Sequence, residues 1–478
     1  MLFNSLSFAI FLPIVFVIYW ALPHKFRWIV LFISSYYFYM SWNVKYVFLI
    51  FITTFVSYLT ALLIEKTEDK TKRKLFLIAA GVISFGILFF FKYFNFFQEN
   101  VVAFFQMFAI QLHPTTLQLL LPVGISFYTF QTFSYVIDVY RGDVPAERHF
   151  GIYATFITFF PQLVAGPIER TSNLLPQIKK EHFFNYEKAA YGMRLMVWGF
   201  FKKLVVADVL AVYVDRIFDT LYTRAGFSLV LAVLFFTVQI YCDFSGYSDI
   251  AIGCAKLLDI DLMQNFKSPY FSDSIKEFWC RWHISLSTWF RDYVYIPLGG
   301  NRKGKLRTHI NLIITFLASG LWHGANWTYI IWGLIHGVSQ VLEKILIPKK
   351  SRKKFTFAWA LRVLLVFIFC AFTWIFFRAE NFKDCIYIIK YLFLGIENPV
   401  NYIKNGFLAM ILTRPAMITV GISLALLAIY DFFSLKMDVI EWVGKQKVVI
   451  RYAIYLAMLI IIMLWKASGE AAFVYFQF

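Results

Sequence analysis

The chain has 478 residues, with 46 Lys and Arg against 28 Asp and Glu, so its net charge is +18. Charged residues make up only 15% of it, whereas soluble domains carry about 25%. Hydrophobic residues reach 60% and the mean hydropathy is +0.65, more apolar surface than one globular core of this size could bury. The composition excludes a soluble enzyme, a disordered chain and a disulfide scaffold, and it predicts a polytopic all-α membrane protein.

The basic residues are gathered in short clusters between apolar runs. The clusters are Lys25/Arg27, Lys66–Lys74, Arg302–Arg307, Lys349–Lys354 and Lys445–Arg451. Such clusters are typical of the cytoplasmic loops of membrane proteins, so we expect all five inside the cell and no nucleic acid partner. The five cysteines have no Cys-x-x-Cys spacing, and we expect them to be buried without a chemical role.

Apolar runs of about 20 residues are long enough to cross a bilayer as helices. Candidate spans lie at 7–23, 28–42, 46–64, 75–94, 118–138, 151–166, 190–212, 227–254, 309–345 (interrupted), 356–377, 406–432 and 449–466. The runs at 101–112 and 383–395 are too short or too mixed to assign. We expect about eleven crossings, beside re-entrant or interfacial helices. No linker or repeat divides the chain, so residues 1–478 are interpreted as one membrane-embedded domain.

The clusters also predict the orientation. The first run has no Lys or Arg before it, unlike a signal peptide, so it should remain as an anchor. Two crossings separate Lys25/Arg27 from Lys66–Lys74, which places the N-terminus outside. The last run starts at cytoplasmic Arg451, which places the C-terminus outside as well. We therefore expect a multi-pass protein, surrounded by membrane lipid, with both termini extracytoplasmic.

The first polar stretch in chain order contains two interrupted runs. Leu121–Tyr128 (LPVGISFY) is followed by Pro161–Arg170 (PQLVAGPIER). Within a membrane, Pro and Gly interruptions are tolerated where the freed backbone is buried in protein or lines a cavity. Two such runs predict broken helices around a cavity, and ordinary kinks at loop boundaries are the alternative.

The second polar stretch, Gln239–Asp249 (QIYCDFSGYSD), ends a long apolar run. Asp243 and Asp249 are six residues apart, about 240° around a helix, so they are not a paired acid and base. The stretch also lacks the Gly-x-Ser-x-Gly frame of a nucleophile elbow. Polar residues at the end of a helix explain it as well as a functional site does.

The third polar stretch is Lys276–Tyr293 (KEFWCRWHISLSTWFRDY). Its spacing predicts a helix, whose charge and Trp content suit an interface or a re-entrant wall. The neighbours expected along this helix are Glu277 with Arg281, His283 with Ser287, and Trp282 with Trp289.

His323 follows in Ser319–Trp327 (SGLWHGANW), inside a strongly apolar segment where Asn326 is the nearest polar residue. A buried neutral imidazole can remove a proton from a hydroxyl, as acyl transfer to an alcohol requires. The alternative is a structural histidine, hydrogen-bonded to a neighbouring helix. We expect no metal, because His283, His323 and His336 match no ligand spacing and no His-Glu-x-x-His motif is present.

These motifs resemble the membrane-bound O-acyltransferase family, and most closely its bacterial branch with the membrane subunit of the alginate O-acetylation machinery. The similarity runs through nearly the whole chain. Its most specific segments are MLFNSLSFAIFLP, LPVGISFYTFQTFSYVIDVYRG, FFPQLVAGPIER, YCDFSGYSDIAIG, FWCRWHISLSTWFRDYVYIPLGGNR and LWHGANWTYIIWGLIHG.

The resemblance implies a ring of helices around a central funnel, where a cytoplasmic acyl thioester and an outer acceptor meet. It implies that His323 is the catalytic base and that His283 is the second polar residue of the family signature. We expect four further residues to bind substrate or support the site: Asn326, Trp322, Arg291 and Asp249. No CoA-binding motif is visible, so acetyl-CoA as the donor, and no bound cofactor, follow from the resemblance alone.

The last residues, Phe473–Phe478 (FVYFQF), resemble the C-terminal signature of this bacterial branch. The resemblance implies that Tyr475 carries the acyl group on the outer side. An aromatic tail lying at the membrane interface is the alternative.

The sequence as a whole predicts an enzyme of the bacterial cytoplasmic membrane. It would move acetyl from acetyl-CoA toward an extracytoplasmic polysaccharide, through an esterase-like (SGNH-type) partner outside. A transporter or flippase for a lipid-linked glycan is the alternative from another class, and it predicts inverted repeats with polar residues along several broken helices. A non-catalytic scaffold of a polysaccharide-export complex is the third interpretation.

Overall fold

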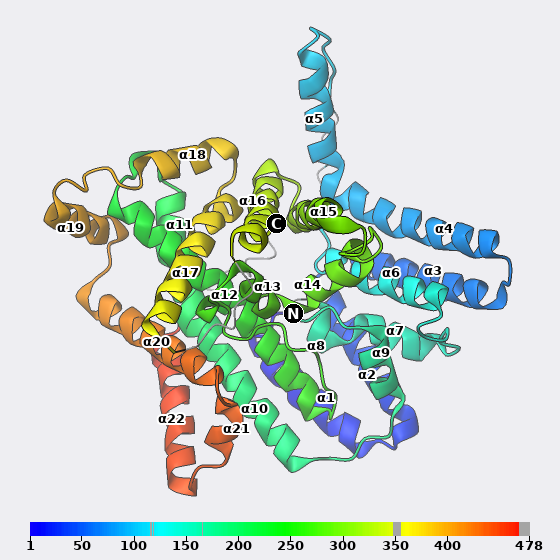
Figure 1. Ribbon diagram of the computed structural model, residues 1–478. Helices are drawn as coiled ribbons and strands as arrows, with labels where there is room; N and C mark the ends of the chain where they lie inside the picture. Colours follow the sequence, from blue (N-terminus) through cyan, green and yellow to red (C-terminus); the bar gives the residue numbers. More distant parts are fainter. Residues whose placement is uncertain (115–116, 118, 165, 348–354, 468–478) are drawn as a thin grey trace. The chain divides into compact units, whose positions relative to one another are not determined.

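The computed structural model describes residues 1–114, 117, 119–164, 166–347 and 355–467 (Figure 1). These residues form helices and connecting loops, and none of those described forms a strand. The chain divides into two compact units, residues 1–193 with 250–263 and residues 194–249 with 264–478. The helices α10 (Tyr186–Phe200) and α12 (Phe227–Leu257) contribute residues to both units.

The first unit holds the helices of the N-terminal part. They are α1 (Leu6–Ala21), α2 (His24–Met40), η1 (Val44–Tyr46), α3 (Val47–Lys66), α4 (Lys70–Leu88), η2 (Phe89–Tyr93), α5 (Phe94–Gln106), α6 (Ile125–Arg141), α7 (Phe150–Thr158), α8 (Phe160–Leu163) and α9 (Thr171–Lys179). The antiparallel helices α3 and α4 pack against α6, and α5 projects from the end of α4 (Figure 1).

The second unit holds most of the polar motifs. Its elements are η3 (Phe201–Ala207), α11 (Asp208–Phe218), η4 (Leu221–Thr223), η5 (Pro269–Phe271), α13 (Ile275–Arg281), α14 (Ile284–Phe290), η6 (Arg291–Tyr295), α15 (Gly304–His323), α16 (Trp327–Leu346), α17 (Phe357–Arg378), α18 (Phe382–Tyr391), α19 (Pro399–Met410), α20 (Arg414–Ser434), α21 (Val439–Gly444) and α22 (Val448–Trp465). The elements η2, η3 and η6 are π-helical turns.

Within the described part of the chain, six helical segments are long and apolar enough to cross a membrane. They are Val44–Lys66, Lys70–Gln106, Phe227–Leu257, Phe357–Arg378, Arg414–Ser434 and Val448–Trp465. The expected count of about eleven crossings stays a prediction, because several expected spans are broken. The run at 151–166 is interrupted between α7 and α8, and the run at 309–345 is divided between α15 and α16.

The interrupted runs of the first unit meet each other, as broken helices should. Gly124 precedes α6 with a φ of +76°, and a Cβ there would lie 2.7 Å from the carbonyl oxygen of Leu163. The break before α8 frees the carbonyl of Phe156, which accepts hydrogen bonds from the amides of Gln131 (2.9 Å) and Gln162 (3.0 Å). Side chains thus replace the lost helical bonds, which a break inside a membrane requires. The broken helix is confirmed between α7 and α8, whereas the run 121–128 holds the start of α6 at Ile125, with no helix over 119–124. The cavity stays a prediction.

The helices α15 and α16 form a tightly packed hairpin in the second unit. A Cβ at Gly320 would lie 2.3 Å from the carbonyl oxygen of Tyr329, and a Cβ at Gly333 would lie 2.3 Å from that of Phe316. Only glycine allows the two backbones to come this close. This hairpin holds His323 at the end of its first helix.

Candidate active site

His323 is the last residue of α15, and only 4% of it is exposed. Three aromatic rings surround the imidazole, with centroids 5.0 Å (Trp322), 5.2 Å (Trp332) and 5.2 Å (Phe377) away. They come from α15, α16 and α17. Packing on three sides fixes the orientation of the ring, as a base that must meet a hydroxyl at one angle requires.

His336, on the next helix, shows what a structural histidine looks like in this fold. The indole N–H of Trp279 donates to its Nδ1 at 3.2 Å, so the imidazole proton lies on Nε2. Nε2 is 3.1 Å from the hydroxyl oxygen of Thr373, which itself donates to the carbonyl of Cys370. Both ring nitrogens of His336 are therefore used in holding α13, α16 and α17 together.

His283 is fully buried and lies between α13 and α14, where its φ of +42° is left-handed. Its Nδ1 is 3.3 Å from the amide oxygen of Asn265, an atom that only accepts, so Nδ1 carries the proton and Nε2 the lone pair. The same oxygen accepts the hydroxyl of Ser285 at 2.7 Å. A left-handed backbone conformation is strained for histidine, and the surrounding contacts must hold it in place. Such backbone strain is typical of functional sites.

This backbone turn corrects the prediction of a single helix over 276–293. The helix α13 ends at Arg281 and α14 begins at Ile284, so Trp282 and Trp289 do not lie two turns apart on one helix. The predicted pair of Glu277 with Arg281 is confirmed at 2.9 Å. Ser287 meets His283 only through the backbone, because its own hydroxyl donates to the carbonyl of Trp282.

The structure places His323 and His283 next to one shared residue. The ring of Trp322 lies 5.0 Å from His323 and 6.1 Å from His283, centroid to centroid. Trp322 thus belongs to the surroundings of both histidines. Among the described residues, no group of three His, Cys, Asp or Glu side chains could hold a metal ion.

Asn326 has a structural task in this arrangement. Its amide oxygen accepts the backbone N–H of Thr328 at 3.0 Å and caps α16, and its amide nitrogen donates to the carbonyl of Glu380 at 2.6 Å. These bonds use the side chain of Asn326 to fix the start of α16, the helix that follows His323, which is a supporting role.

Two of the other expected site residues form ion pairs, and the third is not described. Arg291, at the start of η6, is largely exposed and pairs with Asp292 at 2.7 Å. Asp249 forms an ion pair of 2.7 Å with Lys202. Tyr475 lies outside the residues that the structure describes.

The lysines Lys202 and Lys203 were missed by the sequence analysis. Lys203 pairs with Asp243 at 2.6 Å and with Asp208 at 2.8 Å, and the side chains of all three are at most 4% exposed. We expected the polar stretch 239–249 at the end of a helix, but it lies in the middle of α12. Two lysines inside the apolar run 190–212 were the available signal, since ionisable residues at membrane depth are costly and mark functional or structural sites.

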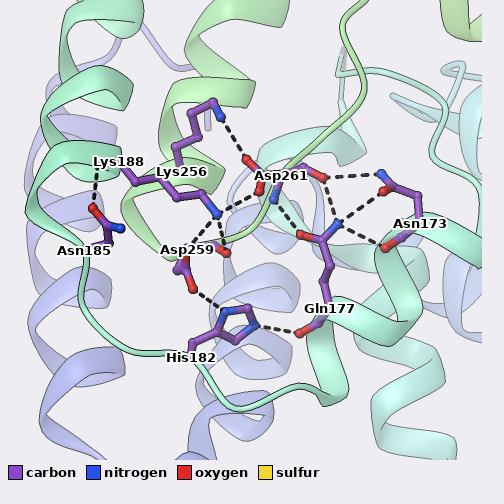
Figure 2. A network of polar contacts seen from close by, with 8 residues as sticks. All are labelled: Asn173, Gln177, His182, Asn185, Lys188, Lys256, Asp259 and Asp261. Carbon is purple, nitrogen blue, oxygen red and sulfur yellow. Dashed lines mark hydrogen bonds and ion pairs between the residues drawn. The ribbon is translucent and has the colours of Figure 1, made fainter. Parts of the chain in front are cut away.

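A further polar network in the first unit follows the end of α12 (Figure 2). Lys188 donates to the carboxylates of Asp259 (2.7 Å) and Asp261 (2.8 Å), and Lys256 donates to Asp261 at 2.8 Å. The ring of His182 lies 2.8 Å from Asp259. Burial alone would raise the pKa of both carboxyls, but the hydrogen bonds from Lys188 and its neighbours outweigh it and hold each pKa below its usual value. The network fixes the loop that leaves α12.

Comparison with known proteins places this site in a family. The model of the membrane-bound O-acyltransferase family matches residues 149–382, which include both histidines. The chain is 37% identical to the probable alginate O-acetylase of Pseudomonas putida over the full length of both proteins. It is 37% identical to the peptidoglycan O-acetyltransferase of Helicobacter pylori, covering 82% of this chain and 79% of that protein.

A more distant relative is the teichoic acid D-alanyltransferase of Streptococcus thermophilus. It is 31% identical over 51% of this chain and 62% of its own length. Together, these matches show that the chain belongs to the membrane-bound O-acyltransferase family and is a multi-pass membrane O-acyltransferase.

Proposed function

We propose that this enzyme transfers acetyl from acetyl-CoA, on the cytoplasmic side, toward the hydroxyl groups of an extracytoplasmic polysaccharide. The observation that carries the proposal is the buried His323, which is packed against three aromatic rings, one of which, that of Trp322, also lies near His283. The names of the relatives support the acceptor class, because alginate, peptidoglycan and teichoic acid are all extracytoplasmic polymers.

In the proposed reaction, His323 removes the proton from an acceptor hydroxyl as the oxygen attacks the thioester carbonyl. The C–O bond forms, the C–S bond breaks, and the proton passes from the imidazole to the leaving thiolate, which departs as CoA thiol. His283 presents the lone pair of Nε2 and orients donor or acceptor. The acceptor hydroxyl is that of Tyr475, which then passes acetyl to an esterase-like partner outside.

The charge clusters support the orientation that this reaction needs. With the basic clusters inside, both termini lie outside the bacterial cytoplasmic membrane, so Tyr475 is on the side of the polymer. Family membership favours group transfer over glycan transport. The scaffold interpretation makes a different prediction, since a scaffold would keep its function without His323.

The test is His323→Ala in a host that lacks its own copy of the gene. We expect a loss of about 10²–10⁴-fold in base-labile acetate on the exported polysaccharide, because a positioned base contributes that much to the rate. His309→Ala is the control, since His309 lies on the same helix as His323 and is only partly buried. Acetate near the wild-type level, at equal amounts of inserted His323→Ala protein, would show that His323 is structural.

A further inference from the structure

The consecutive lysines Lys202 and Lys203 both point at α12. They lie in the π-helical turn η3, and they are 3% and 2% exposed. The Nζ of Lys202 is 2.7 Å from the carboxylate of Asp249 and donates to the hydroxyl of Ser245 at 2.9 Å. Ser245 and Asp249 are four residues apart on one face of α12, so Lys202 binds two successive turns of that helix.

The neighbouring face of the same turn of α12 holds His283. The ring of Phe244 meets the imidazole edge to face, with 4.6 Å between centroids. The hydroxyl of Ser248 accepts the amide N–H of Asn265 at 3.3 Å, and the other end of that amide lies 3.3 Å from Nδ1 of His283. Phe244 and Ser248 are also four residues apart and share one face of α12. This face is adjacent to the face of Ser245 and Asp249.

At Gly246, no side chain separates the backbone of α12 from that of the segment leading into η3, so a movement of one is passed to the other. A Cβ at Gly246 would lie 2.8 Å from the carbonyl oxygen of Gly199 and 3.0 Å from the backbone nitrogen of Lys203. The two backbones therefore touch where Lys202 binds. Because the backbones of η3 and α12 are in direct contact, a movement of α12 at Asp249 must also move Phe244 and Ser248 on the neighbouring face.

We propose that Lys202 is a positioning residue that acts through α12 on His283. Its ion pair with Asp249 fixes the rotation of α12, and α12 in turn fixes the imidazole through Phe244 and through Ser248 and Asn265. Asp249 accordingly acts within the protein and not on a substrate. Without the lysine cation, the carboxylate of Asp249, whose side chain is 19% exposed, would lack its partner, and α12 would rotate or admit more water to solvate it. The inference rests on the proposed acetyl transfer.

The experiment measures transfer of labelled acetyl from acetyl-CoA to base-labile esters, in membrane vesicles of the host that contain the full chain. For Lys202→Met we expect kcat to fall on the order of 10–100-fold, the cost of a misplacement of about 1 Å, with an unchanged KM for acetyl-CoA. Lys202→Arg should restore part of the rate because it returns the cation. The double variant Lys202→Met/His283→Ala should be no slower than His283→Ala alone, since both changes disturb one group.

Tyr222→Phe is the matched control. It removes a hydrogen bond of 2.6 Å from another buried carboxylate of the same unit, that of Asp384, and should leave kcat unchanged. Wild-type kcat in Lys202→Met, or losses that multiply in the double variant, would overturn the proposal. So would failure of both Lys202→Met and Asp249→Asn to insert and fold, because the pair would then serve folding alone. Wild-type vesicles without labelled ester would instead contradict the proposed function.

Discussion

Three buried histidines in the second unit differ in their partners and not in their burial. His336 has both nitrogens engaged, His283 shares an acceptor with Ser285, and His323 is held by rings. The sequence motif indicated His323, whereas no sequence pattern predicted the structural role of His336. The partners of His336 lie 57 and 37 residues away along the chain, and local spacing carries no trace of them.

At the same scale, Tyr475→Phe tests the proposed acyl relay. The substitution keeps the ring and removes only the hydroxyl, so we expect acetylation of the exported polymer to be lost. A phenol suits a relay because its pKa, about 10, makes phenolate a better leaving group than an alkoxide. Mass spectrometry of the wild-type chain should find acetyl on Tyr475.

Deletion of residues 473–478 separates the relay from simple docking of the tail. If the deletion abolishes acetylation while Tyr475→Phe retains it, the aromatic tail is a docking element and the relay is wrong. Loss in both variants, with acetyl on the wild-type tyrosine, agrees with a relay.

Among the helices, the apolar runs were predictable and the interruptions inside them only partly so. The Pro and Gly residues of 161–170 correctly predicted a broken helix in this region, whereas those of 121–128 precede or begin α6. The break at His283 was not visible, because neither Pro nor Gly marks it and its left-handed turn depends on Asn265, 18 residues earlier. The lysines of η3 were missed because two of their aspartate partners, Asp243 and Asp249, lie on α12, 40 residues after Lys203 and 47 residues after Lys202.

The loop after α12 should depend on pH through Asp261, whose folded-state pKa is lowered mainly by Lys188 and Lys256 against the opposing effect of burial. A lowered pKa stabilises the fold above the unfolded value of about 3.9, and that contribution is lost as the pH falls through the folded value. We expect Asp261→Asn to lower the thermal midpoint in detergent at pH 7. The difference from wild type should narrow as the pH falls below about 3.9 toward the lower folded value.

Comparison of the two midpoints across this pH range is the measurement, and Asp215→Asn serves as a control in the second unit. A difference between wild type and Asp261→Asn that stays constant from pH 7 to pH 3 would mean that the carboxylate charge does not stabilise the loop.

At the scale of the whole chain, the long apolar helices differ in how much of their surface is buried. None of the residues in the apolar window of Val448–Trp465 is buried, whereas 78% of those in the window of Phe227–Leu257 are. Composition was enough to predict this contrast in general, but not which helix would be central. Burial of α12 follows from polar partners on several elements, which no single hydropathy window contains.

The orientation of the whole chain can be tested with single cysteines in a Cys280→Ala background. The expectation that all five cysteines are buried is wrong for Cys280, which is exposed, and holds for the other four. We expect Lys45→Cys to react with an impermeant maleimide in intact cells. Thr71→Cys should react only after the cytoplasmic membrane is opened, because it lies in the basic cluster Lys66–Lys74. Labelling of Thr71→Cys in intact cells would reverse the orientation and remove Tyr475 from the outer side.

The π-helical turn η3 also restricts how the gene can change in length. A π-turn holds one residue more than an α-turn, so it is the structural trace of a single inserted amino acid. Loss of one codon within Phe201–Ala207 would let the segment relax into a regular α-helix and would rotate α10 by about 100° relative to α11. Lys202 and Lys203 could then no longer both reach α12. At this point an in-frame deletion of three nucleotides should be harder to tolerate than most substitutions.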